Sequence, residues 1–359
     1  MPSLFTEFHL KDVRLKNRIA VSPMCQYSAP EGFAGEWHLV HLGARAIGGA
    51  ALVIAEATAV APEGRITPGC TGIWSEAHAE RFMPVARFIK TQGCVPGIQL
   101  AHAGRKGSAY VPWQGQGNLA PDDPQAWQPI GPSDIAFGGN LTRVPQAMTK
   151  DEIGRVQGEF AAAAKRALAV GFEWLELHFA HGYLAQSFFS PIANKRGDAY
   201  GGNFEGRARF ILETFSAVRT VWPERFPLTV RLGMTDFHPE SQPLEESIEL
   251  ARQLKSRGLD LIDASLGGNS PDVSGVPYGP AFMVPIAERV RREADIPAAV
   301  SWQITEPAQA DAIIRDGRVD LVLLARAMLN DPHWPFHAAK ALGLADYRNV
   351  LPPQYHRVT

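Results

Sequence analysis

The stretch WLELHF at residues 174–179 decides the fold. It is short and mostly apolar, with Gly171 and Glu173 before it and Gly182 after it. A run of this kind predicts a buried β-strand. Further segments of similar composition, also bounded by Gly, Pro or charged residues, lie at 18–24, 51–58, 95–101, 228–234, 261–266, 298–304 and 321–326.

Helix-like patterns separate these predicted strands. Residues 149–170 begin with Thr149, have Glu152 three positions later as in a capping box, and are followed by Gly171. Eight strands, each followed by a helix-sized segment, predict an α/β fold in which a parallel sheet closes into a (β/α)8 TIM barrel. A doubly wound open sheet is the main rival, but the chain has no G-x-G-x-x-G fingerprint. The other predicted helices span 204–219, 244–256, 282–292, 307–315 and 333–342.

Three segments depart from a minimal barrel. Residues 6–17 alternate around a Lys-Asp turn and predict a hairpin that closes the bottom of the barrel. Residues 103–148 are rich in Gly, Pro, Asp and Trp, and a connection of this length predicts a cap over a functional site. Residues 350–359 form a C-terminal tail, and no linker divides the chain, so we expect a single domain over 1–359.

Composition narrows the possible functions. The formal net charge is −2 and no block of like charge occurs, which argues against a nucleic-acid or membrane partner. The three cysteines, Cys25, Cys70 and Cys94, argue against a disulfide framework, a zinc site or an iron–sulfur cluster. Without an apparent signal peptide or membrane span, the chain is expected to be cytoplasmic.

Polar residues interrupt the predicted strands on one face. Side chains alternate along a strand, so Glu176 and His178 should point into the barrel, as should Arg231 and Gln99. A buried arginine is costly unless it is paired, so either a salt bridge with Glu56 or Glu176 or an electron-rich ligand should accompany Arg231.

His178 and His181 end one of these strands. Zinc would need a third ligand, and none stands out, because His38 and His41 lie in a helix-like segment where surface or capping roles fit better. We therefore expect no metal, and interpret the pair as hydrogen-bond donors to a substrate oxygen, with the phenol of Tyr183 as a further donor.

The last two strands predict an anion site. Barrels often bind phosphate at the loops after strands seven and eight, which here contain Ser301-Trp302-Gln303 and Ala325-Arg326. Arg326 can hold a phosphate with two hydrogen bonds, although a surface ion pair would explain the residue equally well.

The motifs together resemble the old yellow enzyme family, in particular its bacterial xenobiotic reductases and thermophilic-type ene-reductases. The resemblance runs nearly end to end, and its order and spacing are specific. It rests on NRIA at 17–20, SPMCQY at 22–27, IAEAT at 54–58, PEGR at 62–65, QLAHAGR at 99–105, ELHFAHGYL at 176–184, FFSP at 188–191, NKR at 194–196 and YGG at 200–202.

The resemblance implies a barrel that holds FMN non-covalently, with NADPH or NADH as reductant; it does not decide between the two. It implies that residues 22–25 and Ala57 line the flavin, that Gln99 and Arg231 face its pyrimidine edge, and that Cys25 lies near N5. The implied cofactor-binding residues are Ser22, Pro23, Met24, Cys25, Ala57, Gln99, Arg231, Ser301, Trp302, Ala325 and Arg326.

The implied reaction is reduction of the C=C bond of α,β-unsaturated carbonyl or nitro compounds. His178 and His181 would hold the substrate oxygen, Tyr183 would protonate the α-carbon, and Tyr27 and Trp302 would contact the substrate. The resemblance also implies a homodimer or larger homo-oligomer in which Arg357 reaches a neighbouring site. A non-catalytic flavin-binding redox sensor is the alternative.

Overall fold

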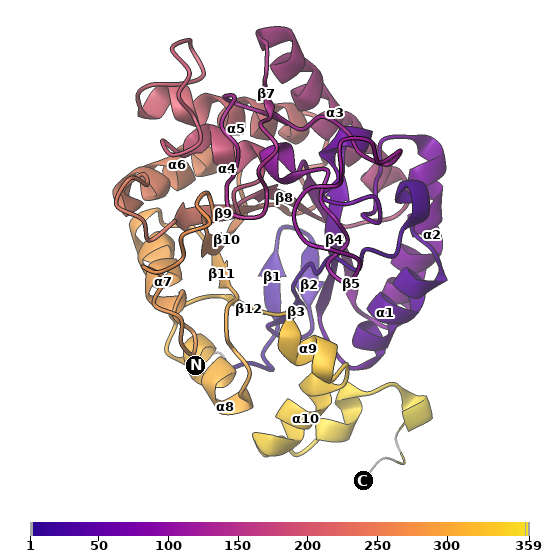
Figure 1. Cartoon of the computed structure of the whole chain (residues 1–359). Coiled ribbons are helices and arrows are strands. Elements are labelled where there is room, and N and C mark those ends of the chain that lie inside the picture. Colours follow the sequence, from indigo (N-terminus) through magenta and orange to yellow (C-terminus); the bar gives the residue numbers. More distant parts are fainter. Residues whose placement is uncertain (1–2, 356, 358–359) are drawn as a thin grey trace.

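The computed structural model describes residues 3–355 and residue 357. Eight parallel strands form a closed barrel, as the sequence predicted (Figure 1). The closing contact pairs the last strand with the first, Val322 opposite Ile19 and Leu324 opposite Val21. In order around the barrel the strands are β3 (Ile19–Val21), β4 (Leu52–Ala59), β5 (Val95–Ala101), β8 (Trp174–Phe179), β9 (Leu228–Thr235), β10 (Leu261–Leu266), β11 (Ala298–Val300) and β12 (Leu321–Leu324).

Helices surround this barrel (Figure 1). The capping box that predicted the start of α3 is present: the Thr149 backbone N–H donates to Glu152 Oε2 at 2.7 Å, and the Glu152 N–H donates to Thr149 Oγ1 at 3.2 Å. The α-helices are α1 (Glu36–Ile47), α2 (Glu76–Thr91), α3 (Lys150–Ala169), α4 (Leu184–Phe189), α5 (Phe204–Arg219), α6 (Leu244–Ser256), α7 (Val284–Glu293), α8 (Pro307–Arg315), α9 (Arg326–Asn330) and α10 (Trp334–Ala341). The 3-10 turns are η1 (Pro30–Gly32), η2 (Pro62–Gly64), η3 (Gly104–Lys106), η4 (Tyr347–Val350) and η5 (Pro353–Tyr355).

The apolar core has two layers, and strand alternation separates them. Leu175 and Leu177 belong to the layer between strands and helices, whereas Trp174 belongs to the layer inside the barrel. The same holds on β9, where Val230 and Leu232 lie in the outer layer. These two layers confirm the inward and outward faces that alternation predicted for β8 and β9.

A two-stranded hairpin closes the bottom of the barrel, as predicted from residues 6–17. Strands β1 (Phe8–Leu10) and β2 (Val13–Leu15) pair antiparallel. Val13 and Leu15 are buried and pack with Trp174 in the inner layer. Because this end is filled by apolar side chains, it is a packed floor.

The segment 103–148 lies over the opposite end, where the strands have their carboxyl ends (Figure 1). It contains η3 and the short strands β6 (Ile130–Gly131) and β7 (Gln146–Ala147). Arg105 ties it down: its guanidinium donates to the carbonyls of Ile135 and Ala136 within the segment and to that of Asn269 after β10. The segment is thus a cap held at the mouth of the barrel.

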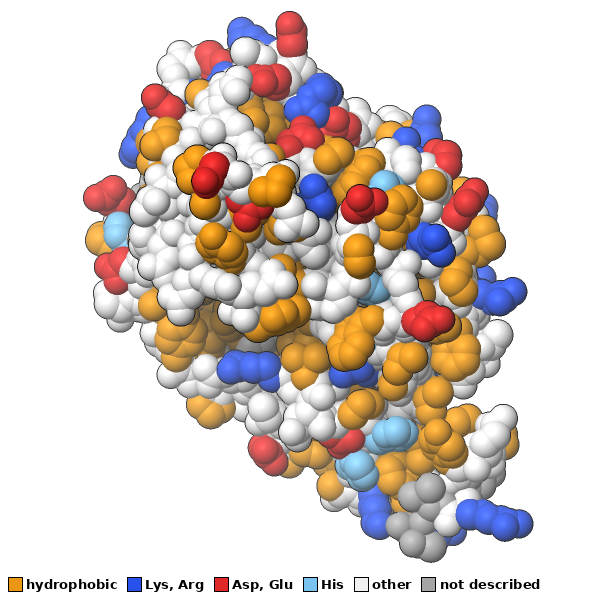
Figure 2. Space-filling model, turned by 45° about the vertical axis from the view of Figure 1, so that its right-hand side comes forward, with side chains coloured by type: hydrophobic (Ala, Val, Ile, Leu, Met, Phe, Trp, Pro, Cys, Tyr) orange, Lys and Arg blue, Asp and Glu red, His pale blue; other side chains and the backbone are white. Residues whose placement is uncertain are grey.

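Charges of both signs are interspersed with apolar side chains on the face in Figure 2, consistent with the small net charge of −2. Within 3–355 and at 357, no helix combines the length and the apolar character needed to cross a membrane.

Candidate active site

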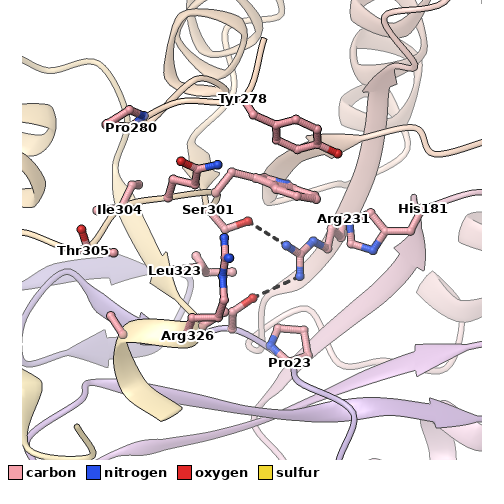
Figure 3. A pocket seen from close by; sticks show the side chains of 15 residues that line it. Pro23, His181, Arg231, Tyr278, Pro280, Ser301, Ile304, Thr305, Leu323 and Arg326 are labelled. Atoms are coloured by element: carbon pink, nitrogen blue, oxygen red, sulfur yellow. Dashed lines mark hydrogen bonds between the residues drawn. The ribbon is translucent and has the colours of Figure 1, made fainter. Parts of the chain in front are cut away.

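A cavity of about 760 Å³ opens at the carboxyl ends of the strands, where barrel enzymes carry their active sites. Arg231 points into it from β9, and Arg326 rises along its wall (Figure 3). The cavity brings together eight of the predicted site residues: Ser22, Pro23, His181, Arg231, Ser301, Trp302, Ala325 and Arg326.

Arg231 is buried, with 6% of its surface exposed, and its partner is Asp263 on β10. The Arg231 Nε lies 3.1 Å from Asp263 Oδ2. Strand register explains this pairing, because Arg231 lies level with Asp263 on one side and with His178 on the other. Of the two alternatives expected for Arg231, the salt bridge was therefore wrong in its partner, which is Asp263 and not Glu56 or Glu176.

The two outer nitrogens of Arg231 point to serine hydroxyls at the cavity (Figure 3). Nη1 donates to Ser22 Oγ at 3.1 Å, and Nη2 donates to Ser301 Oγ at 2.7 Å. These contacts hold the guanidinium plane in one orientation, so its positive charge faces the cavity while Asp263 neutralises it from behind.

The two glutamates have other partners. Glu176 accepts a hydrogen bond from Gln99 Nε2 at 2.7 Å, and burial together with nearby Asp263 raises the pKa of its carboxyl group. Glu56 lies 3.1 Å from His38 Nε2. His38 is buried and its Nδ1 accepts from the Gly35 N–H, so it caps α1 rather than lying on the surface.

His178, His181 and Tyr183 converge just beyond the end of β8. The ring centres of His178 and His181 lie 4.8 Å apart, and those of His178 and Tyr183 lie 5.0 Å apart. All three pairs in the cluster meet edge to face. The sequence-predicted trio therefore forms one aromatic cluster beside the cavity.

A left-handed turn makes this convergence possible. His181 has φ 60° and Gly182 has φ 69°. A Cβ atom at Gly182 would lie 2.1 Å from the Gly268 carbonyl oxygen, so only glycine fits there. The turn reverses the chain so that His181 and Tyr183 both return toward His178.

Ser265 on β10 contacts three polar side chains of the site. Its Oγ accepts from Trp302 Nε1 at 3.0 Å and from Arg231 Nε at 3.4 Å, and it lies 2.8 Å from His181 Nε2. Ser265 thus holds the His181 ring in place and links it to Trp302 and Arg231.

Both histidines are neutral at ordinary pH. Burial, reinforced by the charges of Arg231 and Lys106, lowers the pKa of His178 and of His181 well below 6.5. Burial raises the pKa of the Tyr183 phenol well above 10, so Tyr183 keeps its proton. The His178 Nδ1 is buried and has no hydrogen-bond partner among the described residues.

Four other predicted residues are not part of the cavity lining: Met24, Cys25, Tyr27 and Ala57. Cys25 is half-buried, and burial raises the pKa of its thiol. Tyr27 has φ 51° and faces Trp113 of the cap at 6.0 Å between ring centres. Ala57 is buried on β4, beside a bulge, and Met24 packs at the edge of the core.

Arg357 lies apart from these residues, exposed in the C-terminal tail and absent from the cavity wall.

Several residues of this site were not predicted from the sequence. Asp263 and Ser265 lie on the inward face of β10, in LIDASL, and the alternation applied to β9 would have found them there. Lys106 was not predicted, because its contacts with His181 and Phe137 form only when the cap segment lies over the barrel. Further residues of the cavity lining that were not predicted come from loops, from β12 and from α9: Tyr278, Pro280, Ile304, Thr305, Leu323 and Ala327.

No cluster of three or more His, Cys, Asp or Glu residues suited to a metal ion occurs in the described part of the chain. The site instead offers the cation of Arg231 inside the cavity, and Arg326 on the cavity wall. Two neutral imidazoles and a protonated phenol lie beside Arg231.

Known proteins share this architecture. The family model described as "NADH:flavin oxidoreductase / NADH oxidase family" matches residues 3–345. The NADPH dehydrogenase of Geobacillus sp. (strain WCH70) is 42% identical over 99% of this chain and 98% of the relative. The NADPH dehydrogenase of Bacillus subtilis (strain 168) is 38% identical over 99% and 98%.

Solved structures of related enzymes have the same barrel fold. Morphinone reductase in complex with tetrahydroNAD is similar with a TM-score of 0.80 and 26% identity, covering 99% of this chain and 94% of that one. The old yellow enzyme from Trypanosoma cruzi has a TM-score of 0.79 over 94% and 92%, and at 23% identity this likeness shows the fold alone. The chain therefore belongs to the NADH:flavin oxidoreductase / NADH oxidase family, as an old yellow enzyme-type oxidoreductase that uses FMN and is reduced by NADPH or NADH.

Proposed function

We propose that the chain reduces the activated C=C bond of α,β-unsaturated carbonyl or nitro compounds. The convergence of His178, His181 and Tyr183 beside the cavity that contains Arg231 is the observation that carries this proposal. Two neutral imidazoles can hold an oxygen that gains negative charge, and a protonated phenol beside them can supply a proton.

The cavity suits FMN in size and in the chemistry of its donors. Its volume of about 760 Å³ falls within the range usual for cofactor sites. Arg231, held in one orientation by Ser22 and Ser301, would face the electron-rich edge of the ring system. The resemblance assigns Gln99 to the same edge, although its amide donates to Glu176 here. Arg326 and the Ala325 end of α9 would hold the phosphate, and Ser22 and Pro23 of the cavity wall would line the ring. By resemblance to the family, Met24, Cys25 and Ala57 would approach the ring from just outside this wall.

When bound, FMN supplies the hydride that it has received from NADPH or NADH. The protein residues then have separate tasks. His178 and His181 would hold the substrate oxygen with hydrogen bonds from their ring N–H groups. Tyr27 and Trp302 would contact the rest of the substrate.

Tyr183 would protonate the α-carbon, and the variant Tyr183→Phe tests this role. The substitution keeps the ring and removes only the acidic proton. We expect oxidation of the reduced flavin by 2-cyclohexenone to slow by about 100-fold or more, since general acid catalysis contributes on this scale. Flavin reduction by NADPH should change little. Equal slowing of both half-reactions in stopped-flow measurements would contradict the assignment.

We extend the proposal to a homo-oligomer in which Arg357 contacts the substrate of a neighbouring subunit. The exposed position of Arg357 away from its own cavity is compatible with such a reach. Analytical ultracentrifugation of the full chain tests the assembly, and a monomer at every concentration would exclude it.

A further inference from the structure

We propose that Lys106 is a positioning residue that couples the cap to His181 and Tyr183 and keeps a positive charge beside the proton donor. This inference rests on the proposed function, because it concerns the residues that would hold and protonate the substrate. Lys106 is the last residue of η3, where the cap segment 103–148 leaves the barrel.

The first contact fixes the backbone. Lys106 Nζ donates a hydrogen bond to the His181 carbonyl oxygen at 2.9 Å. His181 has the left-handed φ of 60°, a conformation that a non-glycine residue holds only when its surroundings maintain it. The lysine therefore helps to hold the turn that directs the two catalytic rings toward His178.

The second contact is electrostatic. The Lys106 ammonium lies 4.3 Å from the centre of the Phe137 ring and 5.3 Å from the centre of the Tyr183 ring. Both distances are within the range of cation–π interactions. Phe137 belongs to the cap and Tyr183 follows β8, so one cation between two rings joins the cap to the site.

The charged groups around Lys106 come from several elements. Arg105 precedes it on η3, Asp236 follows β9, and His178 and His181 lie at the end of β8. Lys106 is half-buried as a whole residue, and burial of its ammonium, with the repulsion of Arg105, lowers its pKa to about 8, whereas Asp236 opposes this shift. The lysine is therefore protonated below about pH 8 and neutral above it.

This charge matters for the proton transfer. As Tyr183 gives up its proton, negative charge develops on the phenol, and a cation at 5.3 Å from the ring stabilises that charge. The same cation helps to keep His178 and His181 neutral. Loss of the Lys106 proton should slow only the step in which Tyr183 acts.

The placement of Lys106 can be measured without the reaction. Acetylation by limiting acetic anhydride, read by peptide mapping over a pH series, reports the fraction of neutral amine. In the folded protein the midpoint for Lys106 should lie near pH 8. In the urea-unfolded chain it should move to about 10.4, the ordinary lysine value. Equal midpoints in both states would overturn the placement.

The role is tested by Lys106→Met and Lys106→Arg, with flavin content and thermal unfolding recorded first. We expect Lys106→Met to slow oxidation of the reduced flavin by 2-cyclohexenone by about two- to thirtyfold, the range for loss of a cation–π contact. Flavin reduction by NADPH should change little, because the proton of Tyr183 is not used in that half-reaction. The control Lys90→Met removes a surface lysine paired with Glu173 and should change neither step.

The pH profile separates electrostatics from simple structural support. In the wild type the oxidative step should be fast below pH 8 and fall as pH rises through about 8, because the cation is lost. Lys106→Arg stays charged, so it should show no fall there, and this variant carries the test if the methionine variant does not fold. Lys106→Met should also be flat, but slow.

Two failures are distinguishable. A wild type that does not reduce the enone would overturn the proposed function, and the role of Lys106 with it. A wild type that reduces the enone, together with variants that keep its rate and its fall near pH 8, would overturn the role of Lys106 alone.

Discussion

At the scale of single residues, His178 carries the most specific expectation. Its buried Nδ1 lacks a partner among the described residues, and the ring adjoins both His181 and Tyr183. His178→Ala should slow enone reduction by about 100-fold, as loss of one preorganised donor does. Bound FMN, measured by absorbance after gel filtration, should be unchanged.

The control for this prediction is His9→Ala, on the exposed edge of the hairpin, where 64% of the side-chain surface is accessible. It should leave turnover unaltered. Wild-type kinetics in His178→Ala would remove the donor role assigned to His178.

Asp263 gives a prediction about stability. It is fully buried and is the carboxylate nearest to the Arg231 guanidinium. Asp263→Asn leaves a buried cation without its counter-charge, so the free energy of unfolding in urea should fall by about 3 kcal/mol. Asp295→Asn, at a surface carboxylate with 96% of its side chain exposed, should change it by no more than about 0.5 kcal/mol. Equal stability of the two variants would show that Asp263 does not compensate Arg231.

The sequence predicted the residues of this site better than their contacts. Alternation was sufficient to point Arg231 and His178 inward, because it depends only on strand geometry. The partner of Arg231 depends on which strands are neighbours and on their register, and Asp263 lies level with Arg231 only after the barrel closes. Lys106 likewise has a role only once the cap brings Phe137 against it.

At the scale of elements, the hairpin of β1 and β2 acts as the floor of the barrel. Leu15 is 1% exposed and packs in the inner core layer. Leu15→Ala should lower the free energy of unfolding by about 3 kcal/mol, because it opens a cavity in that layer. Arg14→Ala, on the exposed face of β2, should cost about 0.5 kcal/mol or less.

Both hairpin variants should retain FMN and enone turnover, because the floor lies at the end of the barrel opposite the cavity. Loss of flavin from Leu15→Ala in an otherwise folded protein would contradict this separation of floor and mouth.

The ends of the strands show where sequence patterns fail. Residues 298–304 read as one strand, but β11 ends at Val300, since Trp302 and Gln303 have φ values of 79° and 52°. Residues 321–326 also read as one strand, but α9 starts at Arg326. Apolar composition continues through these points, whereas the backbone leaves the sheet to form the cavity wall.

At the scale of the whole molecule, the barrel separates stability from chemistry. One apolar layer fills the interior of the barrel next to the hairpin, and the other fills the space between the strands and the helices. The polar residues of the site gather at the carboxyl ends of the strands. The cap then closes over that end, held by Arg105 and Lys106. The alternative of a non-catalytic flavin sensor would keep this whole architecture and differ only in what reoxidises the flavin.

One measurement tests the central claim most directly. Purified protein with bound FMN is reduced by one equivalent of NADPH under argon and then mixed with 2-cyclohexenone while the visible flavin absorbance is followed. We predict that the oxidised spectrum returns without oxygen and that one cyclohexanone forms per flavin. A flavin that stays reduced until air is admitted, with no saturated ketone formed, would contradict the account.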